Sequence, residues 1–303
     1  MIRRVAVTGA SGFIGRHVTA AIAARGDASV PIARPFHAST LADAFRDVDS
    51  VVHLAGLTAA VRARDLITAN VDGTRVVAEA AAAVGARMIY VSSLAAAGPA
   101  PASAPRSEDD PPAPITPYGR SKLEGERVVA ATPGLKWTIL RPGAVYGPGT
   151  DALLPLFRAA SFGILPLVGR AGAAYTFIHI DDLVRAITAA IDVDVSGPLF
   201  VGHPRPVTTR ELMEAVRAAS GGTATIIGVP LGLTRIAAAG GDVAGLITGR
   251  VAAINRWRYA EIASDGFVCR VDRIRESLGV VAQVELADGM AGMARWYRSE
   301  GCL

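Results

Sequence analysis

The chain has 303 residues, of which 51% are hydrophobic and 19% are charged; this composition can bury a large core and excludes a disordered protein. Basic residues exceed acidic residues by 31 minus 27, or four, with no cluster of five or more, so we expect no nucleic-acid partner. The two cysteines, Cys269 and Cys302, lack disulfide or metal-ligand spacing. We therefore expect no metal site and a reducing, cytoplasmic location.

Short β-branched runs alternate with alanine-rich helical stretches through the first two-thirds of the chain. This alternation predicts an α/β fold with a doubly wound parallel sheet that binds its ligands at the carboxyl ends of the strands. The predicted strands cover residues 3–7, 30–33, 50–54, 88–92 and 138–141, with helices over residues 66–84 and 117–131 between them.

The cluster Gly147, Pro148 and Gly149 interrupts this alternation and predicts the start of a smaller α/β domain. A helix over residues 179–191 and a strand over residues 198–201 then predict a return to the first domain. We expect a nucleotide-binding domain of residues 1–150 and 176–202, and a discontinuous substrate-binding domain of residues 151–175 and 203–303.

Residues 226–246 form a long apolar stretch that is interrupted by Arg235 and Asp242. A membrane-spanning helix needs roughly 18 to 20 apolar residues without interruption, so we expect no span. We interpret the stretch as a pair of helices in the substrate domain, with association to a membrane surface as the alternative.

A glycine-rich turn follows the first predicted strand and leads directly into a helix. Gly9 and Gly12 permit a tight turn and close approach of the backbone to a pyrophosphate, and Gly15 lets the helix pack against the strand. The backbone amides of Phe13 and Ile14 then face the phosphates from the helix N-terminus. In this context the turn predicts a dinucleotide-binding site.

Arg34 follows the second strand, 19 residues beyond Gly15, where an NAD site usually presents an acidic side chain to the ribose. A guanidinium there can pair with the 2′-phosphate of NADP, and no carboxylate repels it. We therefore predict NADP rather than NAD. The alternative is a solvated strand-end arginine in a protein that takes either cofactor.

Tyr118 and Lys122 are four residues apart in the predicted helix 117–131, so they project from one face. An adjacent ammonium lowers the pKa of a tyrosine and makes it a general acid or base near neutrality. Ser93 ends the fourth strand, where its hydroxyl can bind the substrate oxygen. These three residues are the predicted catalytic group.

Together these motifs resemble the extended short-chain dehydrogenase/reductases, the NAD-dependent epimerase/dehydratase family. The resemblance implies a Rossmann domain, a smaller substrate domain, and a homodimer formed through a helix bundle that includes the Tyr118 helix. It also implies that Leu54, Ala55, Gly56 and Ser92 line the cofactor and that Pro142 and Val145 border the nicotinamide. The supporting motifs are the glycine turn, residues 53–56, 92–93, 118–122, 141–148 and 177–183.

The chain departs from the family's sugar-dehydrating members, which carry an Asp-Glu pair after the catalytic hydroxyl. Here Ser93 is followed by Leu94, Ala95 and Ala96. Without a carboxylate to move a second proton, neither dehydration nor decarboxylation is expected.

Two diphosphate contacts of nucleotide-sugar enzymes are also replaced, by Ala144 and Tyr175, although Arg170, Arg235 or Arg250 could supply the missing charge. The leading hypothesis is an NADP-preferring oxidoreductase acting on a small-molecule carbonyl or secondary alcohol. The alternative is a nucleotide-sugar 4-epimerase or ketoreductase, and a remote alternative is a non-catalytic NADP sensor.

Overall fold

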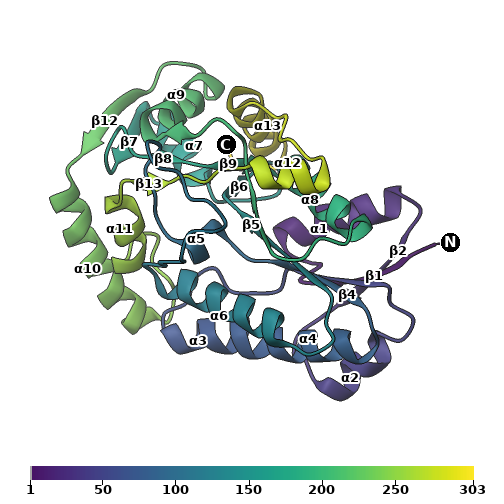
Figure 1. The fold of residues 1–303 in the computed structure, drawn as a ribbon. Helices are drawn as coiled ribbons and strands as arrows, with labels where there is room; N and C mark the ends of the chain where they lie inside the picture. Colours follow the sequence, from purple (N-terminus) through teal and green to yellow (C-terminus); the bar gives the residue numbers. More distant parts are fainter. Residues whose placement is uncertain (1) are drawn as a thin grey trace.

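A six-stranded parallel sheet lies at the centre of the computed structural model, which describes residues 2–303 (Figure 1). The strand order is β2-β1-β3-β4-β5-β10. The order reverses direction between β1 and β3, the topological switch point where doubly wound sheets bind ligands. The strands are β1 (Arg4–Thr8), β2 (Ala28–Ile32), β3 (Ser50–His53), β4 (Arg87–Val91), β5 (Trp137–Pro142) and β10 (Pro198–Val201).

Helices cover both faces of this sheet, which confirms the predicted doubly wound fold. Alternate strand residues serve the two faces: Val5 and Val7 pack into one hydrophobic core, and Ala6 packs into the other. The first face is covered by α1 (Phe13–Ala24), α8 (Ile180–Asp192) and α12 (Asp272–Leu278). The second is covered by α2 (Ala38–Ala44), α4 (Gly73–Ala83) and α6 (Pro117–Ala131).

The predicted helix over residues 66–84 consists of three pieces, α3 (Ala63–Ile67), a π-helical turn η1 (Thr68–Asp72) and α4. Asn70 lies in the π-helical turn. Its side chain accepts a hydrogen bond from the Leu57 amide (2.8 Å) and donates one to the Ser121 hydroxyl (2.9 Å). The turn therefore fixes the loop after β3 against α6.

A third hydrophobic core lies beyond the sheet and is built largely from residues after Gly147. Phe157, Met293 and Tyr297 are fully buried in it. Because α12 packs on the sheet although it falls in the predicted substrate domain, the division into two domains stays a prediction. The strands and helices of the region beyond the six-stranded sheet are β6 (Ala144–Tyr146), α7 (Leu154–Ser161), β7 (Ile164–Val168), β8 (Ala174–Tyr175), β9 (Phe177–His179), β11 (Val207–Thr208), α9 (Thr209–Ala219), β12 (Thr225–Val229), β13 (Gly266–Phe267) and α13 (Leu286–Ser299).

The prediction of two helices over residues 226–246 is wrong. The chain forms β12, which pairs in parallel with β7, and then one continuous helix, α10 (Leu231–Thr248). Pro230 separates the two, because the β-branched residues before it suit a strand and proline is tolerated at a helix start. Gly241 stays helical within α10, and a Cβ there would stand 2.0 Å from the Ile254 carbonyl oxygen. The helix α11 (Arg256–Ala263) follows.

No helix within residues 2–303 is long and apolar enough to cross a bilayer.

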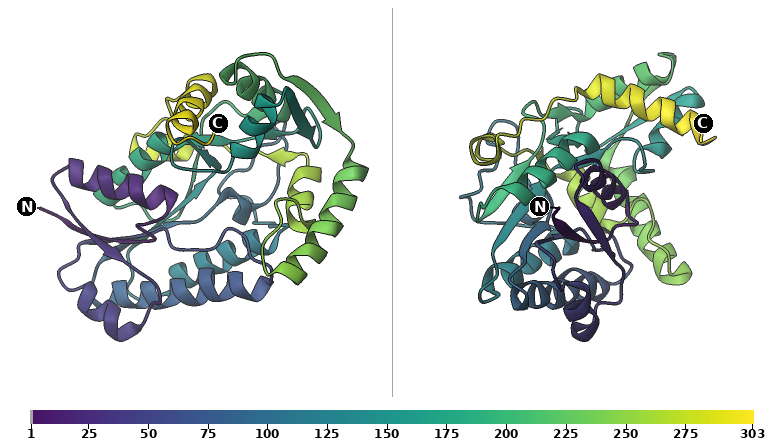
Figure 2. Two further views of the ribbon diagram at one scale, coloured as in Figure 1. Left: turned by 180° about the vertical axis from the view of Figure 1, so that it is seen from behind. Right: turned by 90° about the vertical axis from the view of Figure 1, so that its right-hand side faces the viewer.

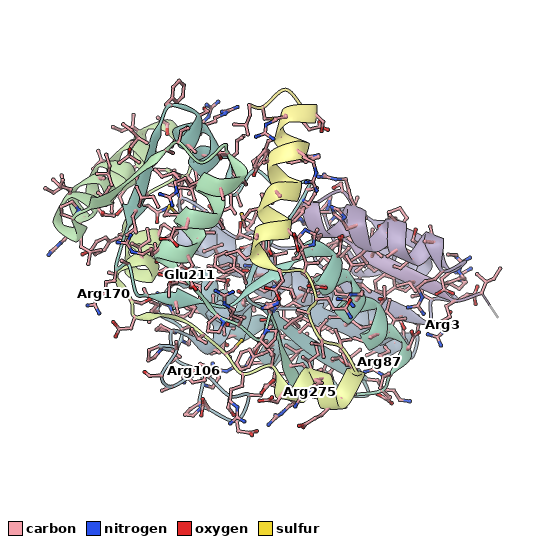
Figure 3. The ribbon with its side chains drawn as sticks, turned by 90° about the horizontal axis from the view of Figure 1, so that it is seen from above. Arg3, Arg87, Arg106, Arg170, Glu211 and Arg275 are labelled. Atoms are coloured by element: carbon pink, nitrogen blue, oxygen red, sulfur yellow. The ribbon has the colours of Figure 1, made fainter. Side chains whose placement is uncertain are left out.

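The exposed Arg3 and the buried Arg87 tie the amino end of the sheet to α8 and to the segment after it. Arg3 forms an ion pair with Asp192, the last residue of α8. Arg87 pairs with Asp194 at 3.0 Å. Arg3 directly precedes β1 and Arg87 is the first residue of β4, so both stand at the amino ends of parallel strands, on the same side of the molecule in Figure 3. The carboxyl edge of the sheet is thus left open for a ligand.

Candidate active site

The glycine turn between β1 and α1 forms one wall of a cavity of about 470 Å³ at the carboxyl ends of the strands. A Cβ at Gly15 would stand 2.1 Å from the Gly9 carbonyl oxygen, and a Cβ at Gly9 would stand 2.9 Å from the Ala55 nitrogen. Gly9 also has a φ of +70°, which favours glycine. The first amides of α1 have no helical acceptor. A dinucleotide phosphate fits this cradle.

Most of the predicted cofactor residues line this one cavity. Ala55 does not: it is buried behind the wall, and its amide donates to the Thr8 hydroxyl (3.2 Å). Arg34 is exposed just after β2 and lies outside the lining. The predicted residues in the lining are Gly9, Gly12, Phe13, Ile14, Gly15, Leu54, Gly56, Ser92, Ser93, Tyr118, Lys122, Pro142 and Val145.

The lining also contains residues that the sequence analysis missed. Several continue a predicted motif by one or two positions, as Leu57 and Thr58 do after Gly56, so their proximity in sequence was the available signal. Thr150 and Ala152 come from the loop after β6, which adjoins no predicted site residue closely enough to provide such a signal. The others are Val91 and Gly143.

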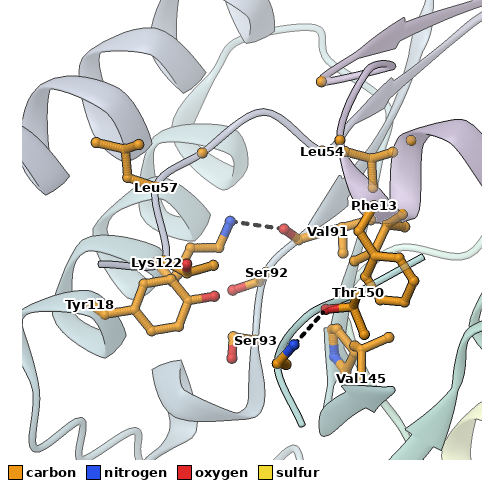
Figure 4. A pocket seen from close by; sticks show the side chains of 18 of the residues that line it. Phe13, Leu54, Leu57, Val91, Ser92, Ser93, Tyr118, Lys122, Val145 and Thr150 are labelled. Atoms are coloured by element: carbon orange, nitrogen blue, oxygen red, sulfur yellow. Dashed lines mark hydrogen bonds between the residues drawn. The ribbon is translucent and has the colours of Figure 1, made fainter. Parts of the chain in front are cut away.

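Tyr118 and Lys122 lie one turn apart at the start of α6 and face the cavity (Figure 4). Thr116 fixes this helix start, because its hydroxyl accepts a hydrogen bond from the Gly119 amide (3.1 Å). The buried Lys122 ammonium donates to the Val91 carbonyl oxygen (2.8 Å) and stands 4.3 Å from the centre of the Tyr90 ring. These contacts hold the lysine at the end of β4.

The pKa of Tyr118 is raised, and not lowered as the sequence analysis expected. Withdrawal from water raises the pKa of Tyr118, although the Ser93 hydroxyl acts in the opposite direction. Burial likewise lowers the pKa of Lys122 to about 7, against the nearby Glu126 carboxylate, which raises it. Because burial favours the neutral form of both groups, Tyr118 is a protonated phenol at neutral pH.

A buried ion pair lies directly behind these residues. The Arg141 guanidinium binds both oxygens of Glu126, at 2.6 and 3.0 Å, and both side chains are about 5% exposed. The Ser92 hydroxyl donates to the same carboxylate (2.5 Å). The sequence analysis missed Glu126, although its spacing of four residues from Lys122 on one helix face was a usable signal.

A second cavity of about 270 Å³ adjoins the first, and Ser93, Tyr118, Pro142 and Gly143 line both. The short helix α5 (Leu94–Ala97), with Ser93 as its N-cap, forms one side of this second cavity. Leu94 and Ala95 line the cavity from α5, and the remaining lining residues are Ala144, Tyr175, Thr176, Arg258, Glu261, Ile262 and Phe267.

The charged residues of the second cavity come from α11. Arg258 donates to the Glu261 carboxylate (3.2 Å), and burial raises the pKa of Glu261. None of the three arginines that the sequence analysis offered as replacements, Arg170, Arg235 and Arg250, lines this cavity. The sequence analysis considered only the residues that follow Ser93 and so missed Glu261, a carboxylate that another segment brings to this cavity.

His53 is fully buried beside the first cavity and makes structural contacts. Its ring nitrogens are hydrogen-bonded to Thr8 (2.7 Å) and Thr74 (3.0 Å). Burial, with smaller contributions from Lys122 and Arg34, lowers its pKa to about 3, so the ring is neutral. Within residues 2–303, no group of three or more His, Cys, Asp or Glu is arranged to hold a metal ion.

Gly15→Ala tests the phosphate cradle. The added methyl group collides with backbone atoms that cannot move away independently, so we expect weaker dinucleotide binding and a lower melting temperature. Gly232→Ala is the matched control, since a Cβ at this helical glycine meets nothing within 4 Å. Titration calorimetry and thermal unfolding measure both effects. Unchanged dinucleotide affinity in Gly15→Ala would contradict the assignment.

The pH dependence of stability tests the burial of Lys122. Between pH 7 and pH 10.5 the unfolded chain holds a proton that the folded chain has released, so this group makes the folded state more stable as pH rises. The gain is at most about 1.4 kcal/mol per pH unit. Urea unfolding across this range should show that gain in the wild type and in the exposed-site control Lys136→Met, but not in Lys122→Met. An equal pH dependence of stability in all three proteins would refute the lowered pKa of Lys122.

Comparison with known proteins agrees with this geometry. A Caulobacter vibrioides protein named ceramide reductase is 29% identical over 99% of this chain and 96% of its own length. The dTDP-6-deoxy-L-talose 4-dehydrogenase (NAD(P)(+)) of Kitasatospora kifunensis is 30% identical over 75% of this chain and 82% of its own.

Among solved structures, MoeE5 in complex with UDP-glucuronic acid and NAD superimposes with a TM-score of 0.78 at 26% identity, covering 98% of this chain and 99% of MoeE5. The sequence pattern of the NAD dependent epimerase/dehydratase family matches residues 5–201. The chain is therefore an enzyme of the NAD-dependent epimerase/dehydratase family.

Proposed function

We propose that this enzyme transfers a hydride between a nicotinamide cofactor and a carbonyl or secondary alcohol, with Ser93, Tyr118 and Lys122 as its catalytic group. One observation carries the proposal: Ser93 and Tyr118 line both the cavity that contains the glycine turn and the cavity beside it. A cofactor in the first and a substrate in the second would meet at these two hydroxyls. Lys122 lines the cofactor cavity only.

Tyr118 and Ser93 have different roles in the proposed reaction. A nicotinamide cofactor, when bound in the first cavity, would supply or accept the hydride at the substrate carbon. Tyr118 donates its phenolic proton to the substrate oxygen during reduction, which suits its raised pKa. The Ser93 oxygen accepts a hydrogen bond from the Ala95 amide (3.1 Å), so its proton is directed to the same substrate oxygen. In the oxidation direction Tyr118 takes the proton back.

Lys122 orients the cofactor end of the site. Its ammonium is held by the Val91 carbonyl, at the edge of the sheet from which the nicotinamide ribose would be reached. With a pKa of about 7, it exchanges a proton near neutrality, so it can also replace the proton that Tyr118 gives up.

The proposed cofactor is NADP. Support comes from Arg34, which follows β2 at the position where an NAD site usually presents an acidic side chain to the ribose. Arg34 is exposed and free to turn toward a 2′-phosphate. The talose dehydrogenase relative is named for use of either cofactor, whereas MoeE5 was solved with NAD.

The second candidate is a nucleotide-sugar 4-epimerase or ketoreductase. It is favoured by Arg258, a cation in the substrate cavity that could meet a diphosphate, and by the UDP-glucuronic acid bound to MoeE5. Glu261 opposes it, since the carboxylate already pairs with this arginine and repels an anionic substrate. The remote candidate, a sensor, is opposed by the presence of Tyr118 and Lys122 in the cavity.

The family resemblance also supports a homodimer built on α6 and a cytoplasmic location. Both stay proposals.

Tyr118→Phe tests the proposed chemistry. Loss of the proton donor should lower turnover by roughly 10²- to 10⁴-fold, while the dissociation constant for the nicotinamide cofactor stays within twofold. Turnover is followed by NADPH absorbance with a panel of ketones, aldehydes and UDP- and dTDP-4-keto sugars. Tyr259→Phe, on α11 but outside both cavities, is the control. Equal turnover in wild type and Tyr118→Phe would disprove the role of Tyr118.

Arg34→Ala tests the cofactor preference. Removal of a charge-assisted hydrogen bond to the 2′-phosphate should weaken NADPH binding about tenfold or more and leave NADH binding unchanged. Fluorescence titration of each reduced cofactor gives both constants. Arg46→Ala, an exposed arginine after α2, serves as the control. If NADPH and NADH affinities fall together, or neither falls, Arg34 does not select NADP.

A further inference from the structure

The helix α10 exposes large aliphatic side chains over most of its surface. It lies along the outer edge of the molecule in both Figure 1 and Figure 2. Three small residues, Thr234, Ala238 and Gly245, are its buried positions. The side chains that point away from the protein are Leu233, Ile236, Val243, Leu246 and Ile247, which are 58–79% exposed. We call these five residues the α10 face.

This arrangement is unlike that of an ordinary surface helix. A surface helix turns its apolar stripe toward the core and a polar face to water. In α10 the buried stripe is made of small residues, which fix the helix in place without covering its larger side chains. An apolar surface of this kind marks a site that is covered by an apolar partner.

The charged residues beside the α10 face indicate the chemical nature of its partner. Arg235 and Arg250 are exposed, and neither forms an ion pair with any of residues 2–303. The acidic residue of the helix, Asp242, is partly buried and faces Arg256 at 3.9 Å. The rim of the face is therefore cationic.

A second copy of the chain fits this rim poorly, because in a twofold interface both copies would contribute a cationic rim and neither would supply the missing negative charge. Anionic lipid headgroups supply the missing negative charge, and the acyl region beneath them takes the aliphatic side chains.

The α10 face also continues toward the proposed catalytic residues. Leu246, from the face, lines a cavity together with Val251, Ala252 and Trp257. The last three residues also line the next cavity, of about 340 Å³, which Tyr118 lines as well. A chain of cavities thus connects the exposed helix with the active site.

We propose that α10 docks this enzyme on an anionic membrane surface, with the α10 face in the acyl boundary and Arg235 and Arg250 among the headgroups. The helix lies in the interface and does not span the bilayer. Docked in this way, the chain of cavities opens toward the lipid, so apolar molecules dissolved in the membrane have a route to Tyr118. Only this last consequence rests on the proposed oxidoreductase function.

Vesicle sedimentation tests the docking. Vesicles of phosphatidylcholine with about one-third phosphatidylglycerol should bind the wild-type protein at low salt, and the binding should weaken in pure phosphatidylcholine or high salt. Leu246→Ser/Ile247→Ser should reduce the partition coefficient at least about tenfold. Arg235→Gln/Arg250→Gln should reduce it about fivefold per residue, and only with the anionic vesicles.

The control is Val84→Ser/Val193→Ser, which changes two exposed valines after α4 and α8 and should bind as the wild type does. Circular dichroism and NADPH titration check that each variant is folded. The proposal is overturned if the wild type does not sediment with anionic vesicles, or if the α10 variants sediment equally well. It is also overturned if the wild type is a dimer that Leu246→Ser/Ile247→Ser dissociates without any binding to vesicles. Because no turnover is measured, these outcomes are independent of the Tyr118→Phe result.

Discussion

The buried ion pair between Glu126 and Arg141 is the interaction on which the active site depends. It joins α6, which carries Tyr118 and Lys122, to β5 at the edge of the cofactor cavity. Two charges are costly to bury unless they are paired and fully hydrogen-bonded. Here the guanidinium binds both carboxylate oxygens and the Ser92 hydroxyl adds a third bond. Loss of one partner leaves the other charge unpaired, at a cost of about 3–5 kcal/mol.

This pair also sets the electrostatics of the site. The Glu126 carboxylate opposes the effect of burial on Lys122 and keeps its pKa near 7 rather than lower. Burial still prevails at both Lys122 and Tyr118, because the site lies in a low-dielectric environment where neutral forms are favoured. A tyrosine that stays protonated and a lysine that exchanges a proton near neutrality together form a proton-donating site. The same environment strengthens every hydrogen bond that the site makes to a substrate oxygen.

The segment that follows β12 contributes both to the second cavity and to the exposed surface of the protein. Its second helix, α11, brings Arg258 and Glu261 into contact with the space in front of Tyr118, and its first helix, α10, exposes an aliphatic surface. These two consecutive helices thus contain both the polar groups that would contact a substrate and the apolar face that would bind a membrane. The small residues at the buried positions of α10 pack closely against the protein and fix the orientation of the helix. The large aliphatic side chains therefore stay exposed.

The sequence by itself determined the parallel doubly wound sheet, the glycine turn and the spacing of Tyr118 and Lys122. These features depend on local periodicity and on backbone constraints, such as the approach of Gly15 to Gly9, that adjacent residues express directly. Only the tertiary structure decided that Glu261 and Arg258 line the second cavity, that Ala55 lies behind the wall of the first cavity, and that the pKa of Tyr118 rises rather than falls. These outcomes depend on contacts between distant segments and on the extent of burial, neither of which is encoded in spacing along the chain. The strand at β12 was misjudged for the same reason: its β-branched residues become a strand by pairing with β7.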